Sequence, residues 1–403
     1  MLKKIILSIS LVSLLFAQTA KEFQEQQKNS FKSYKTNQEE AFKSYKKEQI
    51  KAFDDFKKEL GKIWEDPKIS DKKSWVAYSP DKKTRSKVDF EKETIVVQTV
   101  ATSPEEAKQK LQIALAKVVT VDTKTAQKMD HLEKKLAKIK KPDGVVDGKV
   151  KAEPILATVI FKKPPTRKSV KTYVKKHVQA KKIKVVKSNK VKHSNVYSIS
   201  VKLPSNTMQK RSKVYYDEIQ KNAQKQKLPM PLVFAIMHSE SNFNPRARSH
   251  IPAFGLMQIV PKTAGIDSYN YLYKQKKLVT GSYLYDSTNN IKMGTAYLHI
   301  LYYRYLRKIK NPDSRLYCVI AGYNTGTGNI ACAFNSKTKK KGVTVCSKAK
   351  GDYNINKAAA LINSLTPDQV KEKLLADLRW DEPKHYLKKV SKRMSAYNKI
   401  YGL

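Results

Sequence analysis

The segment over residues 234–261 reads FAIMHSESNFNPRARSHIPAFGLMQIVP and holds one carboxylate, Glu240; the next acidic residue is Asp267. A carboxyl group can act as a general acid near neutral pH when its surroundings raise its pKa. Residues 242–245, Asn-Phe-Asn-Pro, are typical of a helix end. An ionised carboxylate is disfavoured at a helix C-terminus and among apolar side chains. The sequence therefore predicts a raised pKa for Glu240.

Other chemistries fit this segment less well. Ser241 has no histidine and aspartate pair to activate it, so we expect it to brace the turn. The glycines of AGYNTGTG are not followed by the Gly-Lys-Ser/Thr of a phosphate loop. His238 precedes Glu240 by two residues as in zinc deaminases, but the paired cysteines of those enzymes are absent from the sequence. We expect His238 and His250 at the surface or at the rim of a cleft.

The cysteines Cys318, Cys332 and Cys346 stand in no metal-binding spacing, and the sequence implies no metal and no cofactor. In an oxidising compartment, Cys332 and Cys346 could form a disulfide around the polar segment between them. The alternative is three unpaired thiols.

The balance of charge and the N-terminus together suggest an exported protein. The formal net charge is +46, from 81 Lys and Arg against 35 Asp and Glu, which implies a polyanionic partner or surface. Residues 1–17 resemble a signal peptide, with a basic start and an apolar run ending at Ala17. Cleavage is expected after Ala17 or Ala20, an uncleaved anchor being the alternative, and no cysteine near this region offers a lipoprotein anchor. Export to the periplasm makes nucleic acid an unsuitable partner.

Three regions follow the signal peptide. Residues 18–65 include an eleven-residue repeat with one aromatic stripe, which favours an amphipathic helix docked on its own domain or on another copy over one lying on a membrane. Residues 66–200 predict an α+β domain, with short strands in SWVAYS, SKVDF and ETIVVQTVA and a helix capped by Ser103. Its lysine-rich part, residues 161–193, fits edge strands or a solvated linker. Residues 205–403 read as helices.

Three stretches in this last region, ESNFNPRARS, AFGLMQIVPKTAG and AGYNTGTG, resemble the soluble lytic transglycosylase family in order and spacing. Further stretches, such as NIKMGTAYLHILYYRYL and AALINSLTPDQV, most resemble its membrane-bound lytic murein transglycosylase C group. The resemblance covers about residues 210–398 and, more loosely, residues 62–100. It implies an all-α, goose-type lysozyme-like catalytic domain, so the expected fold class is α+β: a helical segment and a small antiparallel sheet, followed by that domain.

The resemblance also implies the chemistry and the site. Glu240 would protonate the glycosidic oxygen between N-acetylmuramic acid (MurNAc) and N-acetylglucosamine (GlcNAc), then take a proton from the C6 hydroxyl of MurNAc to leave a 1,6-anhydro end. Because the substrate's N-acetyl group assists, one carboxylate is enough. The remaining matched positions would contact the substrate, line the cleft or shape its loops: Ser249, Met257, Gln258, Tyr323, Asn324 and, more weakly, Tyr386.

Two departures from the family pattern stand beside the site. Pro252-Ala253-Phe254 replaces the usual small residue or glycine before the Gly-Leu-Met-Gln turn, and CAFNSKTKKKGVTVC extends the chain after the Tyr-Asn motif. The expected partners are peptidoglycan strands, with an anionic membrane surface or the cell-wall machinery as further ones.

Two rival functions remain open. A hydrolytic muramidase on the same fold would need a second acidic group or a positioned water, for which Asp267 and Asp286 are the candidates. The other rival is a catalytically silent cell-wall-binding or scaffold protein, whose working part would be the aromatic repeat.

Overall fold

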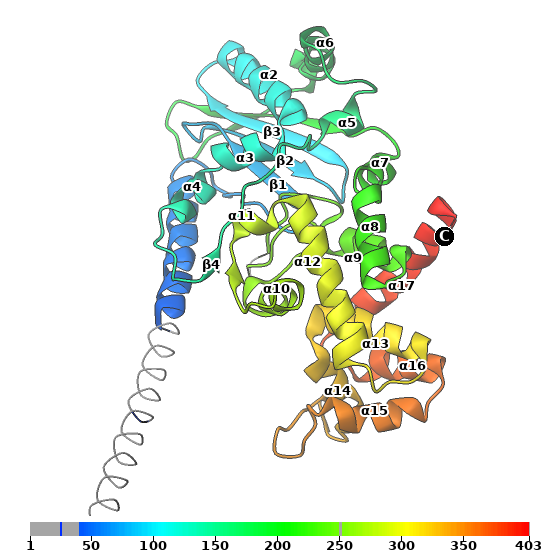
Figure 1. The fold of residues 1–403 in the computed structure, drawn as a ribbon. Helices are drawn as coiled ribbons and strands as arrows, with labels where there is room; N and C mark the ends of the chain where they lie inside the picture. The colour runs from blue at the N-terminus through cyan, green and yellow to red at the C-terminus, as the bar shows by residue number, and fades with distance from the viewer. Residues whose placement is uncertain (1–24, 26–39, 250–251, 403) are drawn as a thin grey trace, which may run out of the picture.

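A helix over residues 40–61 lies beside a five-stranded sheet (Figure 1). The structure, a computed structural model, describes residue 25, residues 40–249 and residues 252–402. The predicted signal peptide, the start of the aromatic repeat and His250 lie outside these residues. Phe56 and Leu60 of the helix are buried with Trp64, Val100 and Leu132. This part of the repeat therefore docks on its own domain.

The sheet is antiparallel throughout, in the order β1-β2-β3-β6-β5. Helix α2 packs across β2 and β3, where Ile95 and Val97 meet Leu111 and Leu115, all four fully buried. The alternating strands and the Ser103-capped helix were predicted correctly, because both signals are local. The strands are β1 (Ser74–Tyr78), β2 (Thr84–Asp89), β3 (Thr94–Ala101), β5 (Lys184–Lys187) and β6 (Asn195–Lys202), and α2 is Pro104–Thr120.

The lysine-rich part was predicted incompletely. It contains a helix, α6 (Arg167–His177), which begins with a capping box between Thr166 and Ser169 and buries only Val174. With so little apolar periodicity, the pattern resembled a linker. The exposed strand β5 forms one edge of the sheet, in agreement with the prediction that this part could contain edge strands. The other elements before residue 205 are α3 (Thr123–Met129), α4 (His131–Ala137), β4 (Val145–Val146), α5 (Ala157–Ile160) and the 3₁₀ turn η1 (Ala180–Lys182).

The C-terminal half is built around α9 (Met230–Ser241). Its residues Leu232 to Met237 are all fully buried, as expected of a helix that is apolar on every side. The helix α17 (Asp381–Tyr401) packs along it. The other elements are the helices α7 (Thr207–Val214), α8 (Tyr216–Gln226), α10 (Ile266–Tyr273), α11 (Gly281–Leu284), α12 (Ser287–Ile300), α13 (Pro312–Thr325), α14 (Thr327–Asn335), α15 (Ile355–Asn363) and α16 (Pro367–Asp377), the π-helical turns η2 (Pro261–Gly265) and η3 (Leu301–Tyr305), and the strands β7 (Leu278–Val279), β8 (Lys339–Lys340) and β9 (Val343–Thr344).

The two halves are in direct contact. The short strand β4 pairs with β7 in parallel, which joins the N-terminal half to the helical half. Side chains from the first half also reach the end of α9, as described below. Of the helices within the described residues, none combines the length and the apolar character needed to cross a bilayer.

Candidate active site

Glu240 occupies the last turn of α9, and only 6% of the residue's surface is exposed. Burial raises the pKa of its carboxyl group, and the charge of Glu382 raises it further. The charges of Lys72 and Lys73 and the interaction with Tyr386 lower the pKa in part. Burial is the largest of these effects, so the predicted direction of the shift is confirmed. A buried carboxyl group of this kind can hold a proton for transfer.

Two tyrosines from different helices lie near Glu240: Tyr386 is buried, and Tyr323 is partly buried. Tyr386 of α17 interacts with its carboxyl group, although the Tyr386 hydroxyl completes no hydrogen bond of ordinary geometry within the described residues. Tyr323 of α13 donates a hydrogen bond of 2.8 Å to the carbonyl oxygen of Met257. Burial, and then the negative charge of Glu240, raise the pKa of both tyrosines, so both keep their protons near neutral pH.

The Gly-Leu-Met-Gln turn is held in place from two sides. The Ser241 hydroxyl donates to the carbonyl oxygen of Leu256 at 2.7 Å, which is the bracing role predicted for it. On the other side, the fully buried Asn290 of α12 accepts a hydrogen bond of 2.7 Å from the amide of Met257 and donates to the carbonyls of Phe254 and Leu284. Asn290 has no local sequence signal, because its three partners lie in other segments.

Ser249 precedes this turn in the chain, and Gln258 is the last residue of the turn. Ser249 closes a small ring with Ala253: the amide of Ala253 donates to Ser249 Oγ at 3.1 Å, and the amide of Ser249 donates to the Ala253 carbonyl at 3.0 Å. Gln258 has a left-handed backbone with φ 49°. Its side-chain nitrogen donates to the Gly255 carbonyl, and its buried Oε1 has no hydrogen-bond partner among the described residues.

The remaining predicted residues do not all meet at Glu240. Asn324 directs its amide to Glu382 at 3.4 Å. Asp267 accepts a hydrogen bond from Tyr305, and Asp286 caps α12, so each of these carboxylates has a structural partner elsewhere. His238 was expected at the surface or at a cleft rim, but it is largely buried beside the Tyr397 hydroxyl, at 3.1 Å.

Sequence reasoning missed the charged groups that surround Glu240. Lys72 and Lys73 come from the stretch before β1, and Glu382 comes from the start of α17. The Glu382 side chain is 74% exposed and lies 3.9 Å from Lys72 Nζ. The family resemblance over residues 62–100 was the one available hint that the N-terminal half reaches the site. No group of three or more metal-ligating side chains occurs in the part of the chain that the structure describes.

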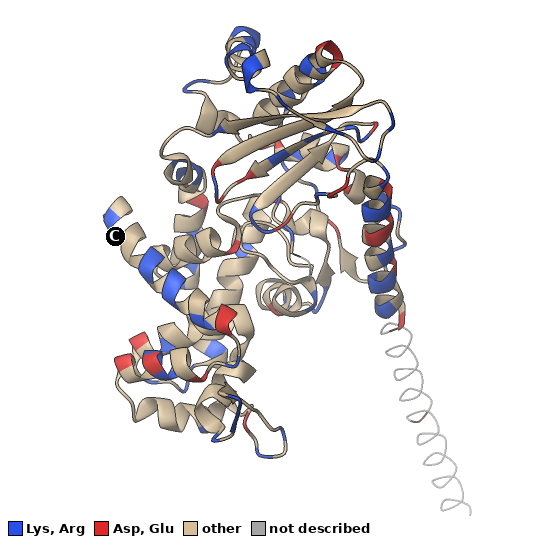
Figure 2. Ribbon diagram, turned by 180° about the vertical axis from the view of Figure 1, so that it is seen from behind, with Lys and Arg blue, Asp and Glu red and all other residues tan. Residues whose placement is uncertain are grey.

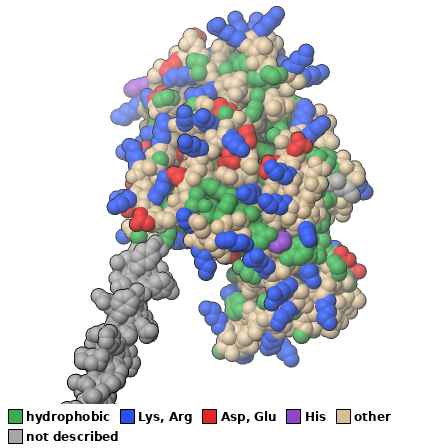
Figure 3. Space-filling model, in the orientation of Figure 1, with side chains coloured by type: hydrophobic (Ala, Val, Ile, Leu, Met, Phe, Trp, Pro, Cys, Tyr) green, Lys and Arg blue, Asp and Glu red, His purple; other side chains and the backbone are tan. Residues whose placement is uncertain are grey.

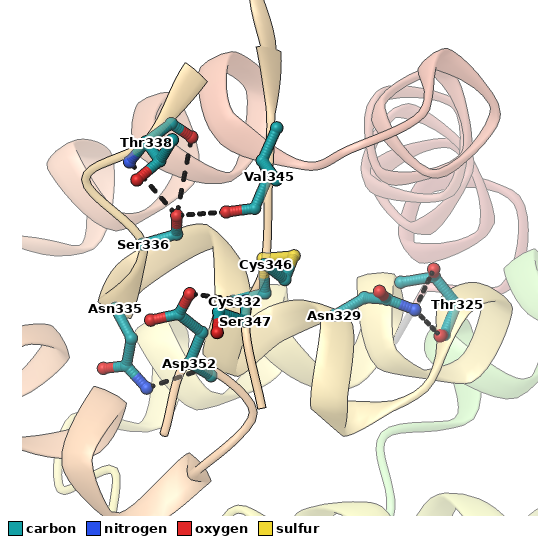
Figure 4. Close-up of a disulfide and its surroundings, with 10 residues drawn as sticks. All are labelled: Thr325, Asn329, Cys332, Asn335, Ser336, Thr338, Val345, Cys346, Ser347 and Asp352. Carbon is teal, nitrogen blue, oxygen red and sulfur yellow. Dashed lines mark hydrogen bonds between the residues drawn. A yellow bond between two sulfur atoms is a disulfide. The ribbon is translucent and has the colours of Figure 1, made fainter. Parts of the chain in front are cut away.

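A disulfide joins Cys332 of α14 to Cys346, with Cα atoms 5.7 Å apart (Figure 4). It closes the segment that holds the β8–β9 hairpin. Hydrogen bonds around Asp352, to Ser347 and Asn335, secure the base of this segment. Cys318 is a buried free thiol, and burial raises its pKa.

Comparison with known proteins relates both halves to one family. The model of the transglycosylase SLT domain matches residues 217–345, and that of the membrane-bound lytic murein transglycosylase C N-terminal domain matches residues 38–214. The chain is 31% identical to the membrane-bound lytic murein transglycosylase C of Serratia proteamaculans over 82% of this chain and 84% of that protein.

Two further comparisons cover about half of the chain. The membrane-bound lytic murein transglycosylase C of Klebsiella pneumoniae is 37% identical over 51% of this chain and 52% of its own length. The crystal structure of the 70 kDa soluble lytic transglycosylase of Escherichia coli matches 49% of this chain and 26% of its own, with 21% identity and a TM-score of 0.35. On the match to both family models and to the Serratia protein, the chain belongs to the family of membrane-bound lytic murein transglycosylases C.

Proposed function

We propose that this protein cleaves the β-1,4 bond between MurNAc and GlcNAc of peptidoglycan without water and leaves 1,6-anhydroMurNAc ends. One observation carries the proposal: Glu240 is a single buried carboxyl group with a raised pKa, at the end of the helix that the family signature marks. Such a group supplies the proton that the leaving oxygen needs. Residues 205–403 would form the catalytic domain, and residues 66–200 the α+β domain before it.

The reaction balances with one carboxyl group. Glu240 gives its proton to the glycosidic oxygen, the bond from that oxygen to C1 of MurNAc breaks, and GlcNAc leaves with a free hydroxyl group. The N-acetyl group of MurNAc stabilises the positive charge that develops at C1. The C6 oxygen then bonds to C1 and passes its proton to the Glu240 carboxylate. Glu240 is thereby protonated again, and no water is consumed.

The residues around Glu240 support a substrate site. The Oε1 atom of Gln258 is buried and unpaired within the described residues, so a sugar hydroxyl or amide could donate to it. The Tyr386 hydroxyl is likewise buried without a completed hydrogen bond there, next to the proton donor. We assign substrate contact to these two residues and to Ser249. Met257 and Tyr323 would line the cleft, and Asn324 would shape its loop.

A hydrolytic muramidase is the second candidate, because Glu382 gives the site the second carboxylate that the sequence did not place there. Glu382 is strongly exposed and lies near Lys72 and Asn324, which makes it less suited to activating a water. The mass of the products separates the two reactions, since hydrolysis adds one water and the proposed reaction does not. A silent wall-binding protein would release no products.

The charge of the surface suits a polyanionic partner. Lys and Arg occur on elements of both halves (Figure 2), and their side chains outnumber those of Asp and Glu across the face shown in Figure 3. We propose a location in the cell envelope, in the periplasm, supported by the signal-like residues 1–17 and by the membrane-bound relatives. The basic surface would bind the carboxylates of peptide stems or anionic lipid headgroups, and added salt should weaken this binding.

A further inference from the structure

Lys73, from the stretch before β1, meets the end of the helix that carries Glu240. Its Nζ donates hydrogen bonds to the carbonyl oxygens of His238 at 3.2 Å and Ser239 at 2.6 Å, and to Asn242 Oδ1 at 2.8 Å. The His238 carbonyl also accepts the amide of Asn242 at 3.1 Å, whereas the carbonyls that end a helix otherwise lack a donor from within it and carry partial negative charge. An ammonium group here therefore caps α9, although it belongs to the other half of the chain.

The turn that follows α9 needs such support. Asn242 and Phe243 both have left-handed backbones, with φ of 51° and 58°. This conformation is unfavourable for a bulky residue such as phenylalanine and persists where surrounding contacts impose it.

Contacts from both halves of the chain surround this turn. The buried Arg211 donates from Nε to the Asn242 carbonyl at 3.2 Å and from Nη2 to the Phe90 carbonyl at 2.9 Å. The side-chain amide of Asn242 also donates to the Phe90 carbonyl, at 3.3 Å. Phe90 follows β2, so the sheet, Arg211 and Lys73 together hold one turn, which starts two residues after Glu240.

We propose that Lys73 is a positioning residue for Glu240: its ammonium group closes the end of α9 and fixes the left-handed turn that orients the general acid. The inference rests on the proposed function, since it concerns the same carboxyl group. It gives the N-terminal half an indirect part in catalysis, through a contact between residues 165 positions apart in the sequence.

The charge of Lys73 acts on Glu240 as well. Burial, and then the charges of Lys389 and Arg393 on α17, lower the pKa of Lys73 to about 7, against the opposing effect of Glu240 and Glu91. His238, which also lies beside this site, has its pKa lowered to about 2 by burial and stays neutral. While Lys73 is charged it lowers the pKa of Glu240, so removing that charge should raise it.

The test compares the wild type with Lys73→Met, which keeps the length of the side chain but removes its charge and its hydrogen bonds. For release of muropeptides from sacculi, we expect kcat to fall roughly tenfold, with KM within about twofold, as for a misplaced catalytic group. The basic limb of the pH profile of kcat/KM, where Glu240 loses its proton, should move to higher pH. Amide hydrogen exchange over residues 240–244 should become faster.

Two variants control this test. Lys92→Met removes an exposed lysine two residues after Phe90 in the chain, and it should match the wild type in all three readouts. Lys73→Arg keeps the charge and the hydrogen-bond donors, so the basic limb of its pH profile should stay at the wild-type pH. If Lys73→Met does not fold, Lys73→Arg alone serves as the test. A basic limb that moves upward in Lys73→Arg, or a folded Lys73→Met with wild-type pH profile and hydrogen exchange, would overturn the inference.

Other outcomes would refute the proposed function and leave the role of Lys73 open to test. An inactive wild type, or a Glu240→Gln variant with full activity, would remove the reaction assigned to Glu240. The hydrogen exchange of Lys73→Met would still report whether Lys73 holds the end of α9.

Discussion

The Tyr323 hydroxyl donates a hydrogen bond of 2.8 Å to the Met257 carbonyl and so links α13 to the Gly-Leu-Met-Gln turn beside Glu240. Replacing Tyr323 with Phe removes this link and leaves a carbonyl without its partner. We expect the free energy of unfolding to fall by about 1 kcal/mol and kcat to fall roughly tenfold, because the turn loses its position. Tyr317→Phe, on the same helix and with no hydroxyl bond among the described residues, is the control. Equal kcat in both variants would contradict this role of Tyr323.

Gly294 lets α12 approach the same turn closely. A Cβ atom at residue 294 would lie 2.9 Å from the Cβ of Met257, and it would also meet the Met257 sulfur. Because the backbone fixes the Cβ of Met257, Gly294→Ala should displace the turn and lower both activity and melting temperature, despite the higher helix propensity of alanine. At Gly322, in α13, a new Cβ meets its nearest atom at 3.8 Å. Gly322→Ala should instead raise the stability, by up to about 1 kcal/mol; a more stable Gly294→Ala would refute the close approach.

The raised pKa of Glu240 has a consequence for stability. A carboxyl group whose folded pKa lies above its unfolded pKa stabilises the fold at low pH, and this contribution is lost as pH rises through the folded pKa. Glu240→Gln cannot ionise, so it should melt at a higher temperature than the wild type at alkaline pH. The difference should shrink as the pH falls.

A glutamate with the opposite shift is the matched control. The hydrogen bond from Lys110, and then those from Thr102, lower the pKa of Glu106 to about 2. Its contribution is present above the unfolded pKa and is lost as pH falls through about 2. Glu106→Gln should therefore lower the melting temperature at neutral pH. The same sign of change in both variants would be evidence against a buried, proton-holding Glu240.

The disulfide between Cys332 and Cys346 closes a loop with a sequence separation of 14. A loop of this size stabilises the folded state by about 3 kcal/mol in the chain-entropy view. Reduction, or serine at both positions, should lower the free energy of unfolding by about that amount, and the double variant should no longer respond to reductant. Thiol titration of the unfolded, unreduced protein should find one reactive group, Cys318. Three groups would show that the bond does not form.

The elements with local signals were predictable from the sequence. Ser103 caps α2, and alternating apolar residues mark β3; both depend on neighbours in the chain. The position of Glu240 at the end of α9 was also predictable, since the Asn-Phe-Asn-Pro motif ends the helix. In α6, by contrast, only one residue is buried among many lysines, so the helical spacing of apolar residues was too weak to recognise.

The partners of Glu240 were not predictable in the same way. Lys73 contacts α9 across 165 residues of sequence. In the sequence alone, nothing distinguishes Lys73 from the other lysines around it, because only the folded chain brings Lys73 to the end of α9. Glu382 was not predictable for the same reason. In the sequence it resembles an ordinary surface residue at the start of a charged helix, and only the packing of α17 against α9 brings its charge to the site. Asp267 and Asp286 were nearer in sequence, but both have structural partners elsewhere.

The most direct test of the account is the mass of the muropeptides that the protein releases from purified sacculi, measured beside Glu240→Gln. The account predicts products one water lighter than those of hydrolysis, and none of them from the variant. Products with reducing MurNAc ends would contradict it and would assign the water-activating role to a second carboxylate, of which Glu382 is the first candidate. Unchanged release of anhydro products by Glu240→Gln would contradict the assignment of Glu240 as the acid.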